Sequence, residues 1–111
     1  AYSGTDNNII VLSHAYMAAT GIKEVTRIED NAFYNSDTII SVDLPDTILE
    51  IGNLAFADCD NLSSITIRSL VPPTLGTNVF LGSEPLLTVF VPAVSLSAYQ
   101  TAWPSLTISA L

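Results

Sequence analysis

The sequence has few charged side chains, and very few of them are positive. Charged residues make up 13% of the 111 residues, and Lys23, Arg27 and Arg68 stand against 11 acids, giving a net charge of −8. Binding to DNA or RNA needs a positive surface against phosphate, and anionic membranes attract basic segments for the same reason. The charge balance therefore excludes nucleic acid as a partner and disfavours an anionic membrane surface.

The residues that most often carry catalysis are also scarce. Cys59 is the only cysteine and His14 the only histidine, so there is no internal disulfide to indicate the compartment. A cysteine nucleophile needs a base partner, and a zinc site needs several Cys or His ligands. The chain also lacks G-x-S-x-G, a Gly-rich phosphate loop and H-E-x-x-H. We therefore expect neither enzyme activity nor a cofactor.

Long hydrophobic runs are absent as well. The longest nearly uncharged run, residues 9–22, has 14 residues and contains polar side chains, which is too short to span a bilayer. The chain is therefore not expected to be embedded in a membrane. No initiator Met or basic n-region marks a signal peptide, and we interpret the start as a processed end or an artificial boundary. With 49% apolar residues the chain is not disordered, and its length suits one domain, residues 1–111.

The sequence does contain an internal repeat. Residues 25–46 align with residues 48–69 at a constant step of 23, and residues 79–92 follow at a step of 24, with the extra residue in the Pro/Gly loop 70–78. Seven apolar pairs share the first step: Val25 and Ile48, Ile28 and Ile51, Ala32 and Ala55, Phe33 and Phe56, Ile39 and Leu62, Val42 and Ile65, Leu44 and Ile67. The third copy adds Phe80, Leu86, Val89 and Val91.

A weaker copy precedes these. Residues 14–26 align if Ile22 lies over Ile39 and Val25 over Val42, with six residues missing. In each copy the last apolar positions alternate with polar ones, which is typical of a strand with one buried face. One such coil cannot bury its own apolar side, so the repeat predicts stacked coils with a short parallel sheet.

The C-terminal segment has the pattern of a cap. Ser95 is a predicted N-cap and Pro104 a stop for a helix over about 96–103, which places Leu96, Tyr99 and Trp103 on one face. That face would cover the last coil, and residues 106–111 could add a final strand. The functional alternative is a sugar-stacking site at Tyr99 and Trp103.

The repeat resembles the BspA-like class of leucine-rich repeats, with its pattern IxxIGxxAFxxCxxLxxIxIP. Residues 48–67 match that pattern almost position for position, and residues 32–45 match with Ser36 in the Cys column. The resemblance implies a leucine-rich-repeat solenoid with a short parallel β-sheet on the concave side, irregular or short helical segments on the convex side, and a C-terminal helical cap. In this interpretation, residues 1–21 are an atypical N-terminal turn or cap, 22–92 the repeats and 93–111 the C-terminal cap.

Taken alone, Cys59 and its acidic neighbours suggest a nucleophile or a metal ligand. Aligning the repeats indicates a different role for them. The column of Cys59 contains Ala19, Ser36 and Ser83, all small, so we expect a packing position where Cys acts as a small hydrophobe. Another column contains Asp37, Asp60 and Glu84. These acids are expected to be solvated turn residues, with a weak calcium site as the alternative.

The remaining candidate site is the outward face of the predicted strands, on the concave side of the solenoid. It is rich in hydroxyl groups and includes one aromatic residue and one Arg, residue types favoured as interface anchors. The alternative is an ordinary β-rich surface. The candidate residues are Glu24, Thr26, Ser41, Asp43, Ser64, Thr66, Arg68, Thr88 and Phe90.

The resemblance also implies a function, since BspA-like repeats occur largely in secreted or surface-anchored bacterial proteins and are often implicated in adhesion. We therefore expect a non-catalytic binding module, secreted or at the cell surface, whose partner is an extracellular or host protein or a glycan. Two alternatives stay open: a structural or capping fragment of a larger surface protein, and a glycan-binding module. The identity of the partner and the oligomeric state are not indicated.

Overall fold

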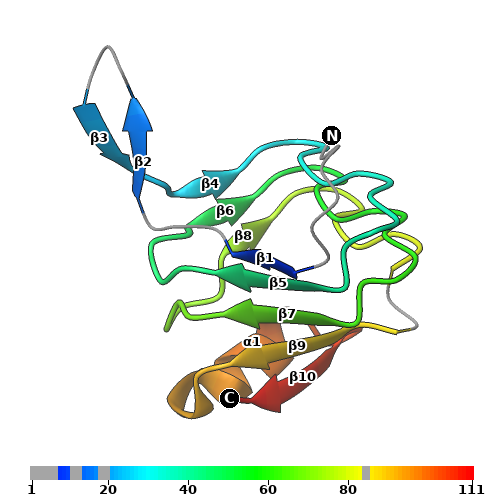
Figure 1. Ribbon diagram of the computed structural model, residues 1–111. Helices are drawn as coiled ribbons and strands as arrows, with labels where there is room; N and C mark the ends of the chain where they lie inside the picture. Colours follow the sequence, from blue (N-terminus) through cyan, green and yellow to red (C-terminus); the bar gives the residue numbers. More distant parts are fainter. Residues whose placement is uncertain (1–7, 11–13, 18–20, 84–85) are drawn as a thin grey trace.

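The computed structural model describes residues 8–10, 14–17, 21–83 and 86–111. Figure 1 shows short strands stacked as successive coils, with one helix near the C-terminal end. The elements are β1 (Asn8–Ile10), β2 (His14–Met17), β3 (Gly21–Glu24), β4 (Arg27–Ile28), β5 (Ser41–Leu44), β6 (Glu50–Ile51), β7 (Ser64–Ile67), β8 (Thr74–Leu75), β9 (Thr88–Val91), the 3-10 turn η1 (Ala93–Ser95), α1 (Leu96–Ala102) and β10 (Thr107–Ala110).

The larger sheet has five strands in the order β1-β5-β7-β9-β10, all paired in parallel. Val42 pairs with Ile65 and Ile65 with Val89, at the steps of 23 and 24 residues found in the sequence. These three side chains are buried, and the residues that alternate with them are only half-buried. The predicted repeat and its parallel sheet are therefore confirmed.

The opposite side of the coils forms a second parallel sheet from the two-residue strands β4, β6 and β8. Gly52 follows β6, and its N–H donates to the Ile28 carbonyl oxygen at 2.7 Å. A Cβ atom at Gly52 would lie 2.6 Å from the backbone nitrogen of Asp30. The glycine of the repeat therefore allows adjacent coils to approach closely on this side.

Left-handed residues recur at two fixed places in the turns that lead from this small sheet back to the larger one. Their step matches the repeat, so each coil bends in the same way. Asn and Asp tolerate this conformation better than most residues, and Gly tolerates it best, which accounts for most residues in these columns. The first column is Asn31, Leu54 and Asn78, and the second is Asn35, Asp58 and Gly82.

At the N-terminal end the predicted alignment is wrong. The strand beside β5 is β1, which pairs Ile9 with Val42, and not the segment that contains Val25. β2 and β3 instead pair antiparallel, with Tyr16 opposite Ile22, and Figure 1 shows this hairpin projecting away from the coils. The two strands of the hairpin pair with each other, and neither joins the larger sheet.

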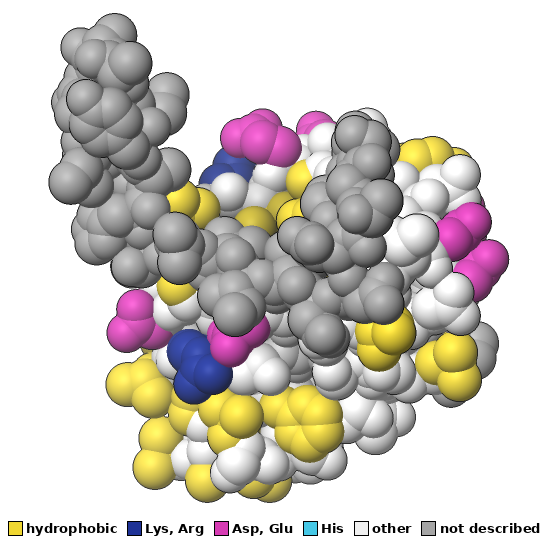
Figure 2. All heavy atoms as spheres, in the orientation of Figure 1, with side chains coloured by type: hydrophobic (Ala, Val, Ile, Leu, Met, Phe, Trp, Pro, Cys, Tyr) yellow, Lys and Arg dark blue, Asp and Glu magenta, His cyan; other side chains and the backbone are white. Residues whose placement is uncertain are grey.

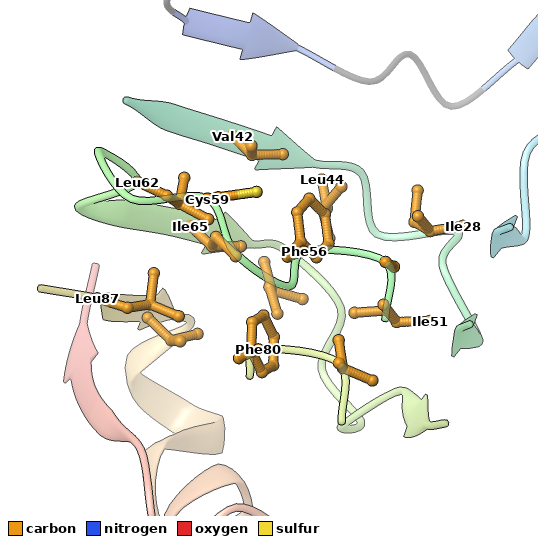
Figure 3. Packing of buried hydrophobic residues seen from close by; sticks show 14 of the residues in the cluster. Ile28, Val42, Leu44, Ile51, Phe56, Cys59, Leu62, Ile65, Phe80 and Leu87 are labelled. Atoms are coloured by element: carbon orange, nitrogen blue, oxygen red, sulfur yellow. The ribbon is translucent and has the colours of Figure 1, made fainter. Parts of the chain in front are cut away.

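The core lies between the two sheets and is continuous along the stack (Figure 3). Phe33 stacks on Phe56 with ring centroids 5.2 Å apart, and Phe56 stacks on Phe80 at 5.9 Å. The same column of the repeat thus becomes a column of rings. Trp103 extends it from the cap, 6.5 Å from Phe80.

The cap has the predicted helix, and its apolar face covers the last coil. Tyr99 and Trp103 are buried, and β10 adds the final strand that residues 106–111 suggested. Ser95 is the N-cap residue, as predicted, but it makes no side-chain capping bond. Its hydroxyl donates to the Leu70 carbonyl oxygen at 2.6 Å instead, and this bond ties the start of the cap to the preceding coil.

One buried position of the third copy lies one residue later than the alignment predicted. Leu87 is buried and Leu86 is exposed, although the alignment placed Leu86 under Leu62. Among the described residues, α1 is the only α-helix, and no helix has the length and apolar character needed to cross a membrane.

Candidate binding face

The candidate site is the outer face of the five-stranded sheet, formed by the half-exposed residues that alternate with the buried ones. The register places Ser64 beside Ser41 and Thr88 beside Ser64. β10 extends both columns by one strand that sequence reasoning did not assign to this face. Among the described side chains, the face contains Ser41, Ser64, Thr88 and Thr107 in one column and Asp43, Thr66, Phe90 and Ser109 in the other.

Two predicted members of this face lie elsewhere. Glu24 belongs to β3 and pairs with His14 in the hairpin, and Thr26 follows that strand, before β4. The positions predicted for them beside β5 are taken by Asn8 and Ile10 of β1. The cause is the inserted hairpin, which the alignment counted as a coil.

Arg68 and Asp43 form an ion pair at the edge of this face. The Arg68 Nε and Nη2 atoms donate to the two carboxylate oxygens of Asp43 at 2.9 and 2.8 Å. This hydrogen bonding and the negative charge of Asp43 raise the pKa of Arg68, so the guanidinium stays cationic. Both side chains remain partly exposed, and the fork is therefore held in place where a partner can reach it.

Phe90 lies in the same column, next to Thr66 of β7. Its ring is half-buried, so it is less exposed than the sequence suggested. The face thus combines a fixed polar pair, a row of hydroxyl groups and one partly accessible ring.

A second charged cluster lies on the small sheet and was not anticipated. Arg27 of β4 donates to Glu50 of β6 at 2.9 Å, to Glu29 at 2.8 Å and to Asp30 at 3.2 Å. The hydrogen bond to Glu50 is the main cause that raises the pKa of Arg27. Both arginines are thus paired with acids of this chain.

Cys59 is a buried structural residue, in agreement with the packing role predicted for it. Its thiol donates to the Phe33 carbonyl oxygen at 3.0 Å, and its N–H donates to the Ser83 hydroxyl at 2.9 Å. One coil later, the Ser83 hydroxyl donates to the Phe56 carbonyl oxygen at 2.7 Å. Burial raises the pKa of the Cys59 thiol, which opposes formation of the reactive thiolate.

The acidic column gives no further support for calcium. Asp37 and Asp60 are exposed turn residues, and Glu84 lies outside the described residues. The side chain of Asn61 donates to the Asp37 backbone carbonyl oxygen at 2.7 Å. In the described part of the chain, no three His, Cys, Asp or Glu side chains gather closely enough to hold a metal ion.

The sugar-stacking alternative at the cap is contradicted by burial. Tyr99 is fully buried and Trp103 is 6% exposed, and the two rings pack edge to face with centroids 5.0 Å apart. Neither ring has a free face for a sugar. A cleft beside Trp103, between the last coil and the cap, is lined by Phe80, Pro104 and other uncharged residues, so none of the described acids or bases lines it.

Comparison with known proteins agrees with this architecture. Residues 17–103 match the BspA type leucine-rich repeat region, in 6 copies. The fold is similar to a leucine-rich repeat protein from Bacteroides capillosus, with a TM-score of 0.63 and 22% identity over 97% of this chain and 79% of that one. It is also similar to a leucine-rich cell surface protein from Faecalibacterium prausnitzii, with a TM-score of 0.62 and 24% identity over 99% of this chain and 37% of that one. A search of the curated proteins gave no match.

Proposed function

Because the chain belongs to the BspA-type leucine-rich repeat family, we propose that it is a non-catalytic module that binds a protein partner through the outer face of its five-stranded sheet. The partner is an extracellular or host protein, and the module acts in adhesion at the cell surface or after secretion. The name of the F. prausnitzii neighbour, a cell surface protein, supports this location. The acidic, hydroxyl-rich surface is compatible with it.

The observation that carries the proposal is the regular outer face itself. The strand register holds hydroxyl side chains in rows, with Thr66 between Asp43 and Phe90. The Asp43–Arg68 fork is fixed by two hydrogen bonds before any partner arrives, so little side-chain entropy is lost on binding. Aromatic and Arg side chains are the usual anchors of protein interfaces.

The test is a binding screen against purified extracellular proteins, with a glycan array in parallel. For a protein that binds, Phe90→Ala should weaken the affinity by roughly tenfold or more. The pair should be removed as a double variant, Asp43→Ala with Arg68→Ala, so that neither charge is left alone.

The matched control is Thr74→Ala, an exposed β8 residue on the small sheet, which should leave the affinity unchanged. If Phe90→Ala and the double variant bind as tightly as the native chain, the outer face is the wrong surface. Binding to glycans with no protein partner would instead support the glycan-binding alternative.

A further inference from the structure

The charges of this protein are distributed very unevenly along the solenoid. Of the 14 charged residues, 13 lie in the first 68 positions, and Glu84 is the only one between residues 69 and 111. Figure 2 shows the same division on the face in view, since its lowest part, below the dark blue and magenta side chains, has hydrophobic and uncharged side chains only. Residues 85–111, which include β9, α1 and β10, therefore contain no charged side chain, although the chain as a whole carries a net charge of −8.

This end of the stack also terminates in an open sheet edge. In the described residues, the five-stranded sheet ends at β10, and no strand lies on its far side. The Leu111 N–H donates to the Val91 carbonyl oxygen of β9 at 2.8 Å. Successive residues of a strand direct their N–H and C=O groups to opposite sides. The N–H and C=O groups of Ile108 and Ala110 therefore point away from β9, toward the open side.

The edge lacks the devices that usually prevent edge-to-edge pairing. Residues 105–111, SLTISAL, contain no charged residue, no Pro and no Gly, whereas natural edge strands are commonly protected by Lys, by Pro or by a bulge. Leu111, which directly follows β10, is 58% exposed. Apolar surface thus lies beside the unpaired backbone groups.

We propose that β10 pairs antiparallel with β10 of a second copy of this chain, so that two five-stranded sheets become one sheet across a two-fold axis. A two-fold contact closes on itself and gives a dimer. It joins the two ends that lack charged side chains and keeps the acidic coils of the two copies at opposite extremes, where their repulsion is weakest. Pairing of β10 with β1 of another copy would instead set the neutral edge against an acidic end and would extend without limit.

The proposal is independent of the outer face being a binding surface, although the dimer would make that face continuous across both copies. Sedimentation velocity over a range of protein concentrations should show the native chain converting to a species of twice its 11.8 kDa mass. The key variant is Ser109→Asp, which places a charge on β10 close to its symmetry mate. We expect its dimer dissociation constant to rise roughly tenfold or more.

The matched control is Ser64→Asp, which adds the same charge to the same face on β7, two strands away from the edge. It should dimerise like the native chain. Ala110→Pro is a second variant, because it removes one outward N–H and should also give monomers, with folding checked by circular dichroism. A native chain that is monomeric at every concentration, one that grows beyond a dimer, or a Ser109→Asp variant that dimerises normally would overturn the proposal.

Discussion

The two parallel sheets of this molecule are built from the same coils but are held together by different means. In the larger sheet, four-residue strands alternate buried and half-exposed side chains, so each coil adds apolar burial. In the smaller sheet the strands have two residues, of which only one is buried in β4 and in β6, and the coils also approach closely through their backbones at Gly52. The larger sheet therefore depends mainly on the alternation of buried and half-exposed side chains, and the smaller sheet depends on close backbone approach as well as on burial.

A side-chain ladder reinforces the smaller sheet. The Asp30 carboxylate accepts the N–H of Asn53 at 2.8 Å, and the Asn53 side-chain oxygen accepts the N–H of Thr77 at 2.8 Å. Each coil is thus bonded to the next at the same place. The smaller sheet is therefore held by backbone geometry and by side-chain hydrogen bonds between coils, in addition to its buried apolar residues.

The largest loss of stability is expected at Phe56, in the core between the two sheets. This ring is fully buried and stacks on rings of both neighbouring coils. Phe56→Ala should lower the free energy of unfolding by about 3–5 kcal/mol, measured by urea denaturation. Phe90→Ala, on the half-exposed outer face, should cost less. If Phe56→Ala and Phe90→Ala lowered the free energy of unfolding equally, the column of stacked rings would contribute no more to stability than the outer face does.

Gly52→Ala tests whether the smaller sheet depends on close approach of the backbones. The added Cβ atom would lie 2.6 Å from Asp30 N and 2.8 Å from the Glu29 carbonyl carbon, and backbone atoms cannot move aside cheaply. We expect a loss of about 1–3 kcal/mol in thermal or chemical unfolding. The matched change on the other side, Ser64→Ala, should stay within about 0.5 kcal/mol. If the two substitutions cost the same, the contrast between the sheets is wrong.

Tyr99→Phe tests how much the bond between the cap and the loop that connects the two sheets contributes to stability. The Tyr99 hydroxyl donates to the Ser69 carbonyl oxygen at 2.7 Å, so its loss should cost about 1 kcal/mol at neutral pH. Burial also raises the pKa of Tyr99 from its ordinary value of 10.0 to about 12. The folded state then holds the proton more tightly than the unfolded chain, so this stability is complete below pH 10 and is lost as the pH rises toward 12.

The measurement is the free energy of unfolding in urea between pH 8 and 12, for the native chain and Tyr99→Phe. The native chain should lose more stability than the variant across that window. Tyr34→Phe is the control, since this side chain is 39% exposed. A native curve parallel to that of Tyr99→Phe would contradict the expectation.

The smallest effect should be a gain in stability, at Leu54. This residue has φ 57° in a column otherwise occupied by Asn31 and Asn78, and the left-handed conformation strains a Leu backbone. Leu54→Asn should raise the unfolding free energy by roughly 0.5–1 kcal/mol. The reverse change, Asn31→Leu, should lower it. A loss of stability in Leu54→Asn would mean that packing of the Leu side chain outweighs the backbone strain.

How much of this could be predicted from the sequence differs between the regions. The larger sheet was predictable, because Val42, Ile65 and Val89 repeat at a nearly constant step and alternate with polar residues. The small sheet was not, since two-residue strands leave no period to detect. The hairpin was missed because the spacing of its apolar residues is similar to that of a coil. The six residues that this copy lacks relative to the others were the sign that it is not a true repeat.

The candidate site shows the same limit. Outward positions such as Ser64 and Thr88 follow directly from strand alternation, and the structure places them side by side. The pairing of Arg68 with Asp43 joins residues 25 positions apart, two beyond the repeat step, so no column of the alignment displays it. Pairings between different columns need the three-dimensional register.

The column of rings has a practical consequence for following how this protein unfolds. Trp103 is the only tryptophan, and it lies in the cap, against Phe80 and Tyr99. Intrinsic fluorescence excited at the indole therefore reports on release of the cap, while far-ultraviolet circular dichroism reports on the stacked strands. Because each coil of a solenoid contacts only its neighbours, the two signals measure separately whether the end frays before the centre or the whole stack opens at once.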